Sequence, residues 1–78
     1  MNATWIAASA AAEATAQQQQ MMEAQAYEQF CAARAELETA GKAAQVIESP
    51  EFHRWISARH DTDLAWGAWA MVMDTRPA

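Results

Sequence analysis

The longest run of regularly spaced apolar positions lies in the second half of a segment rich in alanine and glutamine. Its apolar residues recur at alternating intervals of three and four, which is the spacing of one stripe along a helix. The positions are Phe30, Ala33, Leu37, Ala40, Ala44 and Ile47. Met22 and Ala26 extend the stripe toward the N-terminus. A long helical region is therefore predicted from Asn2 to about Ala40, or as far as Ile47 (residues 2–47), with Asn2 or Thr4 as its N-cap.

Two features inside this region leave its continuity open. The run of glutamines at 17–20 is compatible with helix, because glutamine is a good helix former. Gly41 either ends the helix as a C′ residue or lies inside it at a point of close approach. A helix over residues 3–40 would be about 57 Å long, whereas a globule of this chain length has a radius of gyration of about 11–12 Å. We expect the helix to bend back or to project from the body.

A second helix is predicted over residues 49–60. Ser49 is a good N-cap, Pro50 suits the first helical position, and Glu51 lies at the positive end of the helix dipole. Phe52, Trp55 and Ile56 follow at helical spacing and form one apolar face. Their sequence positions are those of a short amphipathic helix.

A third helix is predicted over residues 62–74, with a cap at Asp61 or Thr62. It contains ten consecutive apolar residues, "LAWGAWAMVM" at 64–73. As a helix, this segment places Trp66, Trp69 and Met73 on one face and is apolar nearly all round, which is typical of a buried helix. We expect it to be covered partly by the long helix and partly by another chain.

Composition supports an all-α fold in a single domain, residues 1–78. The chain has 21 alanines and only two prolines among 78 residues, and alanine is the strongest helix former. The predicted architecture is a long N-terminal helix, bent or broken, followed by two short helices packed on its C-terminal half. Cys31 is the single cysteine, so no internal disulfide is available to stabilise so short a chain.

Charge and targeting patterns exclude some classes of function. The net charge is −5, and a nucleic-acid-binding chain would carry a basic footprint. No basic residue precedes Glu13, which disfavours a signal peptide, and no apolar run approaches the roughly 20 residues of a membrane span. We therefore expect no direct nucleic-acid contact, no membrane span, and synthesis in a cytoplasm.

The chemically reactive side chains form no known signature. Cys31 with His53, His60 and Asp61 has the residue types of a nucleophile and its base, but no motif fixes their geometry. His53 and His60 are seven residues apart, whereas helical metal pairs are usually four apart. We expect no enzymatic activity, no catalytic residue, no metal site and no cofactor.

Arg54 and Arg59 form a local basic patch in an acidic chain. We expect these arginines to pair with Glu48 and Glu51 nearby, and the alternative is an acidic surface on a neighbouring chain.

The large apolar side chains are the candidate interface. Tryptophan is enriched at interface hot spots because it buries a large area and keeps one hydrogen-bond donor. The alternative is that Trp55, Trp66 and Trp69 form the core of the chain itself, and both roles hold in a protein that folds as it assembles. Trp5 lies far from the other tryptophans in sequence and is expected to anchor on a partner or on a C-terminal region folded back along the helix. The candidate residues are Trp5, Phe30, Leu37, Phe52, Trp55, Ile56, Trp66, Trp69 and Met73.

These patterns indicate a non-enzymatic structural or interaction subunit whose partners are other protein chains, as a homo-oligomer, with neighbouring proteins, or both. No motif in the sequence names a family. Within the class of assembly subunits, our hypothesis is a small bacteriophage virion component of the head, neck or tail, located in the virion. The alternative is a small acidic phage-encoded inhibitor that binds a larger complex in the cytoplasm. An assembly chaperone, absent from the finished particle, is a third option.

Overall fold

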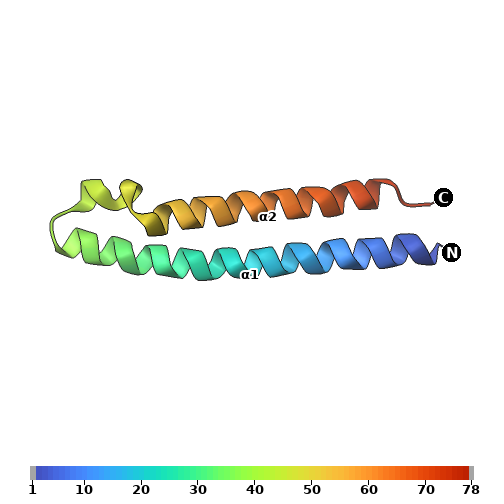
Figure 1. Ribbon diagram of the computed structural model, residues 1–78, viewed down its shortest axis with the longest axis horizontal. Coiled ribbons are helices and arrows are strands. Elements are labelled where there is room, and N and C mark those ends of the chain that lie inside the picture. Colours follow the sequence, from blue (N-terminus) through green and yellow to red (C-terminus); the bar gives the residue numbers. More distant parts are fainter. Residues whose placement is uncertain (1, 78) are drawn as a thin grey trace.

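The computed structural model describes residues 2–77 and shows two antiparallel helices joined by a short connection (Figure 1). Helix α1 spans Ala3–Thr39, the 3₁₀ helix η1 spans Ala43–Glu48, and helix α2 spans Pro50–Asp74. The described residues contain no strand. The hairpin is elongated, with extents of 60 × 15 × 13 Å. The predicted all-α architecture, a long N-terminal helix with later helices packed against it, is confirmed.

Helix α1 is continuous through the glutamine run at 17–20. The Asn2 side chain caps its start, since its Oδ1 accepts a hydrogen bond from the backbone N–H of Trp5 at 3.0 Å. The helix ends at Thr39, which agrees with the predicted limit near Ala40, whereas the longer limit at Ile47 is wrong. Alanine and glutamine favour the helix by intrinsic propensity where the apolar pattern is weak.

Gly41 ends α1, which decides between the two roles that the sequence left open. Its φ is +76°, in the left-handed region. The Lys42 N–H donates to the Leu37 carbonyl at 2.7 Å, and the Gly41 N–H donates to the Glu38 carbonyl at 3.1 Å. These two bonds form a Schellman motif, in which a C′ glycine reverses the chain and satisfies the last carbonyls of the helix.

Helix α2 begins as the sequence predicted. The Ser49 Oγ accepts a hydrogen bond from the Phe52 N–H at 3.2 Å and donates one to the Val46 carbonyl at 2.7 Å. Pro50 follows as the first helical residue, where its missing N–H costs nothing. Ser49 thereby fixes both the end of η1 and the start of α2.

The predicted boundary between two short helices at 60–62 is wrong, because α2 is one helix of 25 residues. Asp61, Thr62 and Asp63 resemble a capping sequence, but no proline or glycine interrupts the helix there. The Thr62 hydroxyl donates to the Ala58 carbonyl at 3.0 Å, one turn back, and also lies 3.1 Å from the Gln19 carbonyl of α1. The residue that looked like a cap instead joins the two helices.

A single α2 of this length covers nearly all of α1, not only its C-terminal half. The helices remain in contact from the Phe30–Phe52 ring pair, 5.5 Å between centroids, to the hydrogen bond between Trp5 and Val72. The long helix therefore neither bends back nor projects alone. The elongated hairpin replaces the compact globule that chain length suggested.

The seam between the helices follows a heptad pattern along its whole length. Partly or fully buried positions of α1 alternate at intervals of four and three, as knobs-into-holes packing requires. On α1 they are Trp5, Ser9, Ala12, Ala16, Gln19, Glu23, Ala26, Phe30, Ala33 and Leu37. On α2 the corresponding positions are Glu51, Trp55, Ala58, Thr62, Ala65, Trp69 and Val72.

The predicted stripe is therefore correct at four of its positions, Ala26, Phe30, Ala33 and Leu37, and wrong beyond them. Ala40, Ala44 and Ile47 are exposed because α1 ends before them. Met22 is also exposed, and Glu23 occupies the seam instead. Two-helix seams have little volume, so small and polar residues pack there as readily as apolar ones.

Candidate assembly interface

Four aromatic side chains form a cluster in the half of the hairpin nearest the connection. The Phe30 ring stacks on Trp55 at 5.2 Å between centroids and 15° between planes. Tyr27 lies 5.0 Å from Trp55, and Phe52 lies 5.5 Å from Phe30. The Arg34 guanidinium covers the Phe30 ring at 5.6 Å. Only 6% of Phe30 is exposed, so this cluster is the main hydrophobic contact of the chain.

The tryptophans join the helices in the other half. Trp66 and Trp69 meet edge to face with centroids 5.5 Å apart, a favoured aromatic geometry. The Trp66 Nε1 donates to the Gln20 Oε1 at 3.2 Å. The Trp5 Nε1 donates to the Val72 carbonyl at 2.9 Å. Of the two expectations for Trp5, the structure shows the second: it anchors on the C-terminal region of its own chain.

The structure places eight of the nine candidate interface residues at least partly between the two helices. These are Trp5, Phe30, Leu37, Phe52, Trp55, Trp66, Trp69 and Met73. The ninth, Ile56, lies on the helix edge and is 43% exposed. These side chains contribute to the packing of the hairpin itself, and their contact with another chain stays a prediction.

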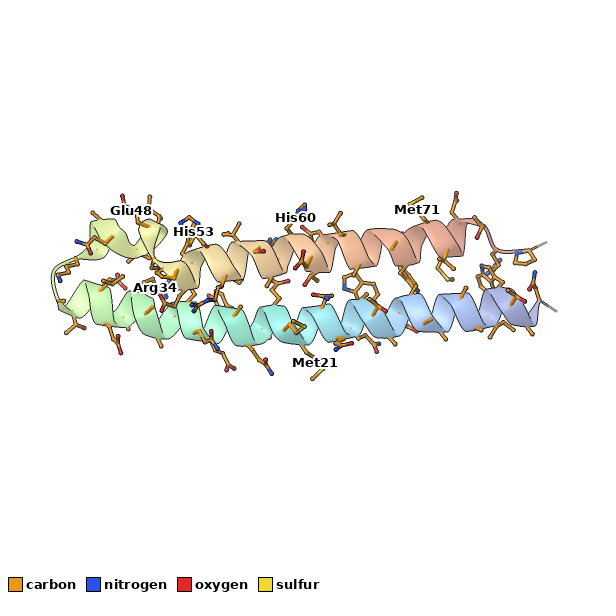
Figure 2. The ribbon with its side chains drawn as sticks, in the orientation of Figure 1. Met21, Arg34, Glu48, His53, His60 and Met71 are labelled. Carbon is orange, nitrogen blue, oxygen red and sulfur yellow. The ribbon has the colours of Figure 1, made fainter. Side chains whose placement is uncertain are left out.

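A different set of apolar side chains faces solvent. The large exposed ones are Ile6, Met21, Met22, Tyr27, Ile47, Ile56, Leu64 and Met71. Leu64 and Met71 belong to the apolar decamer that we expected to be buried, and they are 60% and 73% exposed. Figure 2 shows Met71 pointing away from α1. The expectation of a buried helix is therefore met on one side of α2 only.

Sequence reasoning missed Leu64 and Met71 as candidate interface residues. Their spacing of seven already placed them on one helix face, and the tryptophan spacing placed Trp66 and Trp69 on another. The signal was present, but choosing which face meets α1 requires the partner helix. The larger tryptophans occupy the seam because they bury more area there.

Charged side chains are distributed unevenly along the hairpin. Residues 2–22 and 64–73, which pair in the half nearest the chain ends, carry one charged side chain, Glu13. Residues 23–63 carry eight acidic and four basic side chains, or −4 of the net charge of −5. The half with the fewest charges is also the half that contains Leu64 and Met71.

The residues considered for chemistry are not brought together. His53 and His60 lie on the side of α2 that faces away from α1 (Figure 2). Within residues 2–77, no group of three or more His, Cys, Asp or Glu side chains is arranged to hold a metal ion. Arg54 and Arg59 form no ion pair with Glu48 or Glu51, contrary to the expected local pairing. The ion pair found in this part of the chain joins Arg34 Nε and Glu38 Oε1 at 3.7 Å.

The pKa of Tyr27 is shifted by its neighbours on α1. The Cys31 side chain raises the pKa of Tyr27 above its ordinary value of 10.0, first by hydrogen bonding and then by charge repulsion, with a smaller effect of burial. The nearby Arg34 charge acts in the opposite direction. Tyr27 and Cys31 are one helical turn apart on α1, which explains the contact.

No protein-family model, curated protein or solved structure matches the chain significantly. Among the described residues, neither helix has a stretch that is both long and apolar enough to cross a membrane.

Proposed function

We propose that this protein is a non-enzymatic assembly subunit, which acts by binding copies of itself and neighbouring protein chains. The main observation in support of this proposal is the large surface area of the chain. The chain exposes 5705 Å², whereas a compact monomer of its mass exposes about 4,700 Å². The excess of about 1,000 Å² is close to the roughly 800 Å² that each partner contributes to a standard protein interface.

The sparse core supports the same proposal. Of the apolar side chains in residues 2–77, only Ala16 and Phe30 are buried, and the single cysteine leaves no disulfide available. Small folds with so little buried area usually depend on a metal, a disulfide or a partner. The half of the hairpin nearest the chain ends has few charges and exposes apolar side chains, which a partner could bury.

Within this class, our narrower hypothesis is a bacteriophage virion component of the head, neck or tail. Two features support it: the fold is small, and several large apolar side chains are exposed. An assembly chaperone would share these features, and it differs in being absent from the finished particle. Mass spectrometry of purified particles therefore separates the two.

The second candidate is an acidic inhibitor of a larger complex. The observation in its favour is the net charge of −4 over residues 23–63. The acidic side chains in this half are spread around both helices, and Glu23 and Glu51 lie partly in the seam. An inhibitor of this kind would act through the charged half, whereas an assembly subunit would act through the other half.

The first experiment measures the molar mass of the purified chain by light scattering after size-exclusion chromatography. Circular dichroism on the same fraction measures its helix content. We expect a defined helical oligomer. A poorly folded or aggregating chain would contradict self-association and favour a different protein as the partner. A stable, well-folded monomer would contradict the proposal and favour the inhibitor.

A further inference from the structure

The segment that reverses the chain continues the apolar spacing of the seam. The seam on α1 ends at Leu37, and the seam on α2 begins at Glu51. Between them Ala40, Ala44 and Ile47 follow at intervals of three and four, and Glu51 lies four residues beyond Ile47. A hairpin does not require this spacing, because a reversing segment packs against no partner helix. The spacing is that of one helix whose seam runs from α1 into α2.

The three side chains in the connection do not use this spacing in the hairpin. All three are exposed, and Ile47 is 64% exposed. Ala43–Glu48 form a 3₁₀ helix of six residues, whereas 3₁₀ runs longer than three or four residues are uncommon because their hydrogen bonds have poorer geometry. The alanines, glutamine and glutamate of this segment are good α-helix formers. The connection therefore holds an α-helical sequence in a less favourable helix.

The reversal of the chain depends on Gly41. Its φ of +76° begins the turn, and the N–H groups of Gly41 and Lys42 donate to carbonyls of α1. Lys42, the N-cap of η1, makes no side-chain capping hydrogen bond. With Gly41 in the α-helical region, these N–H groups bond four residues back and α1 continues through residue 48. Pro50, which has no N–H, then kinks the chain at the start of α2 and does not reverse it.

We propose that the hairpin opens at Gly41 and exchanges helices with a second copy, so that α2 of each chain packs in the seam of the other chain's α1. The inference deepens the assembly role proposed above and rests on its self-association. Each seam is filled by the same α2 residues that fill it in the hairpin. Contacts such as Phe30–Trp55 and Trp5–Val72 form again between the two chains. Exchange of an identical element is a low-cost route to a dimer, since only the connection changes its structure.

The antiparallel register specifies what covers Ile47 after the exchange. Phe30 and Phe52, which pair in the seam, lie equally far from Gly41 in the sequence. The two-fold axis therefore passes close to both Gly41 residues, and the two connections lie antiparallel beside each other. In the hairpin, Leu37 lines an open groove of about 530 Å³ at this end of the molecule. In the exchanged dimer, Ile47 of each chain lies beside Leu37 of the other, so both side chains gain buried area.

The charged side chains of the connection are compatible with this pairing. Positions next to a coiled-coil seam face the partner helix, and there Glu48 lies opposite Arg34 of the other chain. Glu36 is also next to the seam, and it lies opposite uncharged residues. Glu38 and Lys42 lie on the side of the helix away from the seam. The pairing therefore brings no like charges together in the connection.

Energy transfer within one chain distinguishes exchange from association of intact hairpins. In a Cys31→Ala background, Ala10→Cys and Ala70→Cys carry a donor and an acceptor at exposed positions near the chain ends. In the hairpin these positions lie side by side, because its cross-section is only 15 × 13 Å. In the opened chain they are up to about 90 Å apart. The labelled chain is refolded with a large excess of unlabelled chain, and monomer and dimer are separated by size-exclusion chromatography.

We expect high energy transfer in the monomer fraction and low transfer in the dimer fraction. High transfer in the dimer would show that intact hairpins associate, which overturns the exchange and leaves the assembly role standing. A wild-type chain that is a folded monomer at every concentration would overturn both. The two failures are therefore distinguishable.

Substitutions at Gly41 test the hinge through the dimer dissociation constant, measured by sedimentation equilibrium. Gly41→Ala disfavours the left-handed turn and favours helix, so we expect it to lower this constant about tenfold or more. Gly41→Asn is the matched control, because asparagine tolerates the turn, and it should lower the constant less. At concentrations where the chain is monomeric, the same strain only destabilises the hairpin. An equal or smaller effect of Gly41→Ala would overturn the proposed hinge.

A substitution at Ile47 tests the paired connections. Ile47→Gln changes a side chain that is exposed in the hairpin, so circular dichroism should show a retained helical fold. We expect it to raise the dimer dissociation constant about tenfold, because Ile47 is buried only after the exchange. Met21 is 66% exposed and points away from α2 (Figure 2), so Met21→Gln should leave the constant within about threefold. Equal effects of the two substitutions would overturn the pairing of the connections.

Discussion

At the scale of single residues, the hairpin depends on a few aromatic contacts. Phe30 is the buried centre of the aromatic cluster, in contact with Trp55 and Phe52. The remaining seam is largely alanine and polar residues, which contribute little buried apolar area. Stability is therefore concentrated in the cluster, and most exposed apolar side chains do not contribute to it.

We expect Phe30→Ala to destabilise the hairpin by about 3–5 kcal/mol, the usual cost of removing a buried aromatic ring. This is a large share of the roughly 4–12 kcal/mol typical of a chain of this length. Met21→Ala is the control, because Met21 is exposed and its truncation should change stability by at most about 0.5 kcal/mol. Urea denaturation followed by circular dichroism measures both. Equal effects of the two substitutions would refute the role assigned to Phe30.

The single tyrosine gives a second test at this scale. Because Cys31 raises the pKa of Tyr27 and Arg34 lowers it, Cys31→Ala should lower that pKa and Arg34→Gln should raise it. Alkaline titration of tyrosinate absorbance reads both shifts directly. The folded-state pKa is raised, so this contact contributes to stability below pH 10 and loses its contribution as the pH rises through the folded-state value. Shifts of the same sign in both variants would exclude this arrangement.

At the scale of elements, the ends of the helices are defined by local chemistry. Ser49 and Pro50 start α2, and Gly41 ends α1 in the left-handed region. The connection between the helices is short because each end is fixed by its own hydrogen bonds. The apparent cap at 61–63 fails as a signal because no residue there stops the preceding helix.

Gly41→Ala should destabilise the chain by about 1 kcal/mol, because an L side chain at positive φ is strained. Gly41→Asn is the matched variant and should cost less, since asparagine tolerates this conformation. No atom lies within 4 Å of the added Cβ, so the difference reports backbone strain and not a steric clash. Thermal melts of the three chains under one condition measure it. An alanine variant as stable as the asparagine variant would show that the turn does not require positive φ.

At the scale of the whole molecule, the hairpin is extended and unevenly charged. Its radius of gyration is 17.5 Å, against about 11.5 Å for a compact chain of its length. Such a shape leaves a large surface for its volume. An elongated hairpin of this kind gains buried area by placing copies side by side.

The melting temperature should therefore rise with protein concentration, as mass action requires when the folded state associates and the unfolded state does not. Melts recorded over a hundredfold concentration range test this. A wild-type chain with a constant melting temperature would contradict association in the folded state.

The fold class and the helix starts were readable from the sequence, because they depend on interactions between near neighbours. Alanine content predicted helices, and Asn2 and Ser49 act as caps within three residues of their partners. The large apolar residues that hold the chain together were also correctly chosen as contact residues. They were assigned to an interface with another chain, however, and eight of the nine lie partly between the two helices of this one.

Three features were decided only by the tertiary structure. Thr62 is buried in the seam, where its hydroxyl lies 3.1 Å from the Gln19 carbonyl of α1. Glu23, and not Met22, lies in the seam because the register of α2 selects the face of α1 that is covered. The exposure of Leu64 and Met71 follows from the same choice. The sequence determined which residues form helices, whereas the choice between two apolar faces of α2 required α1, because periodicity defines a face but not the neighbour that covers it.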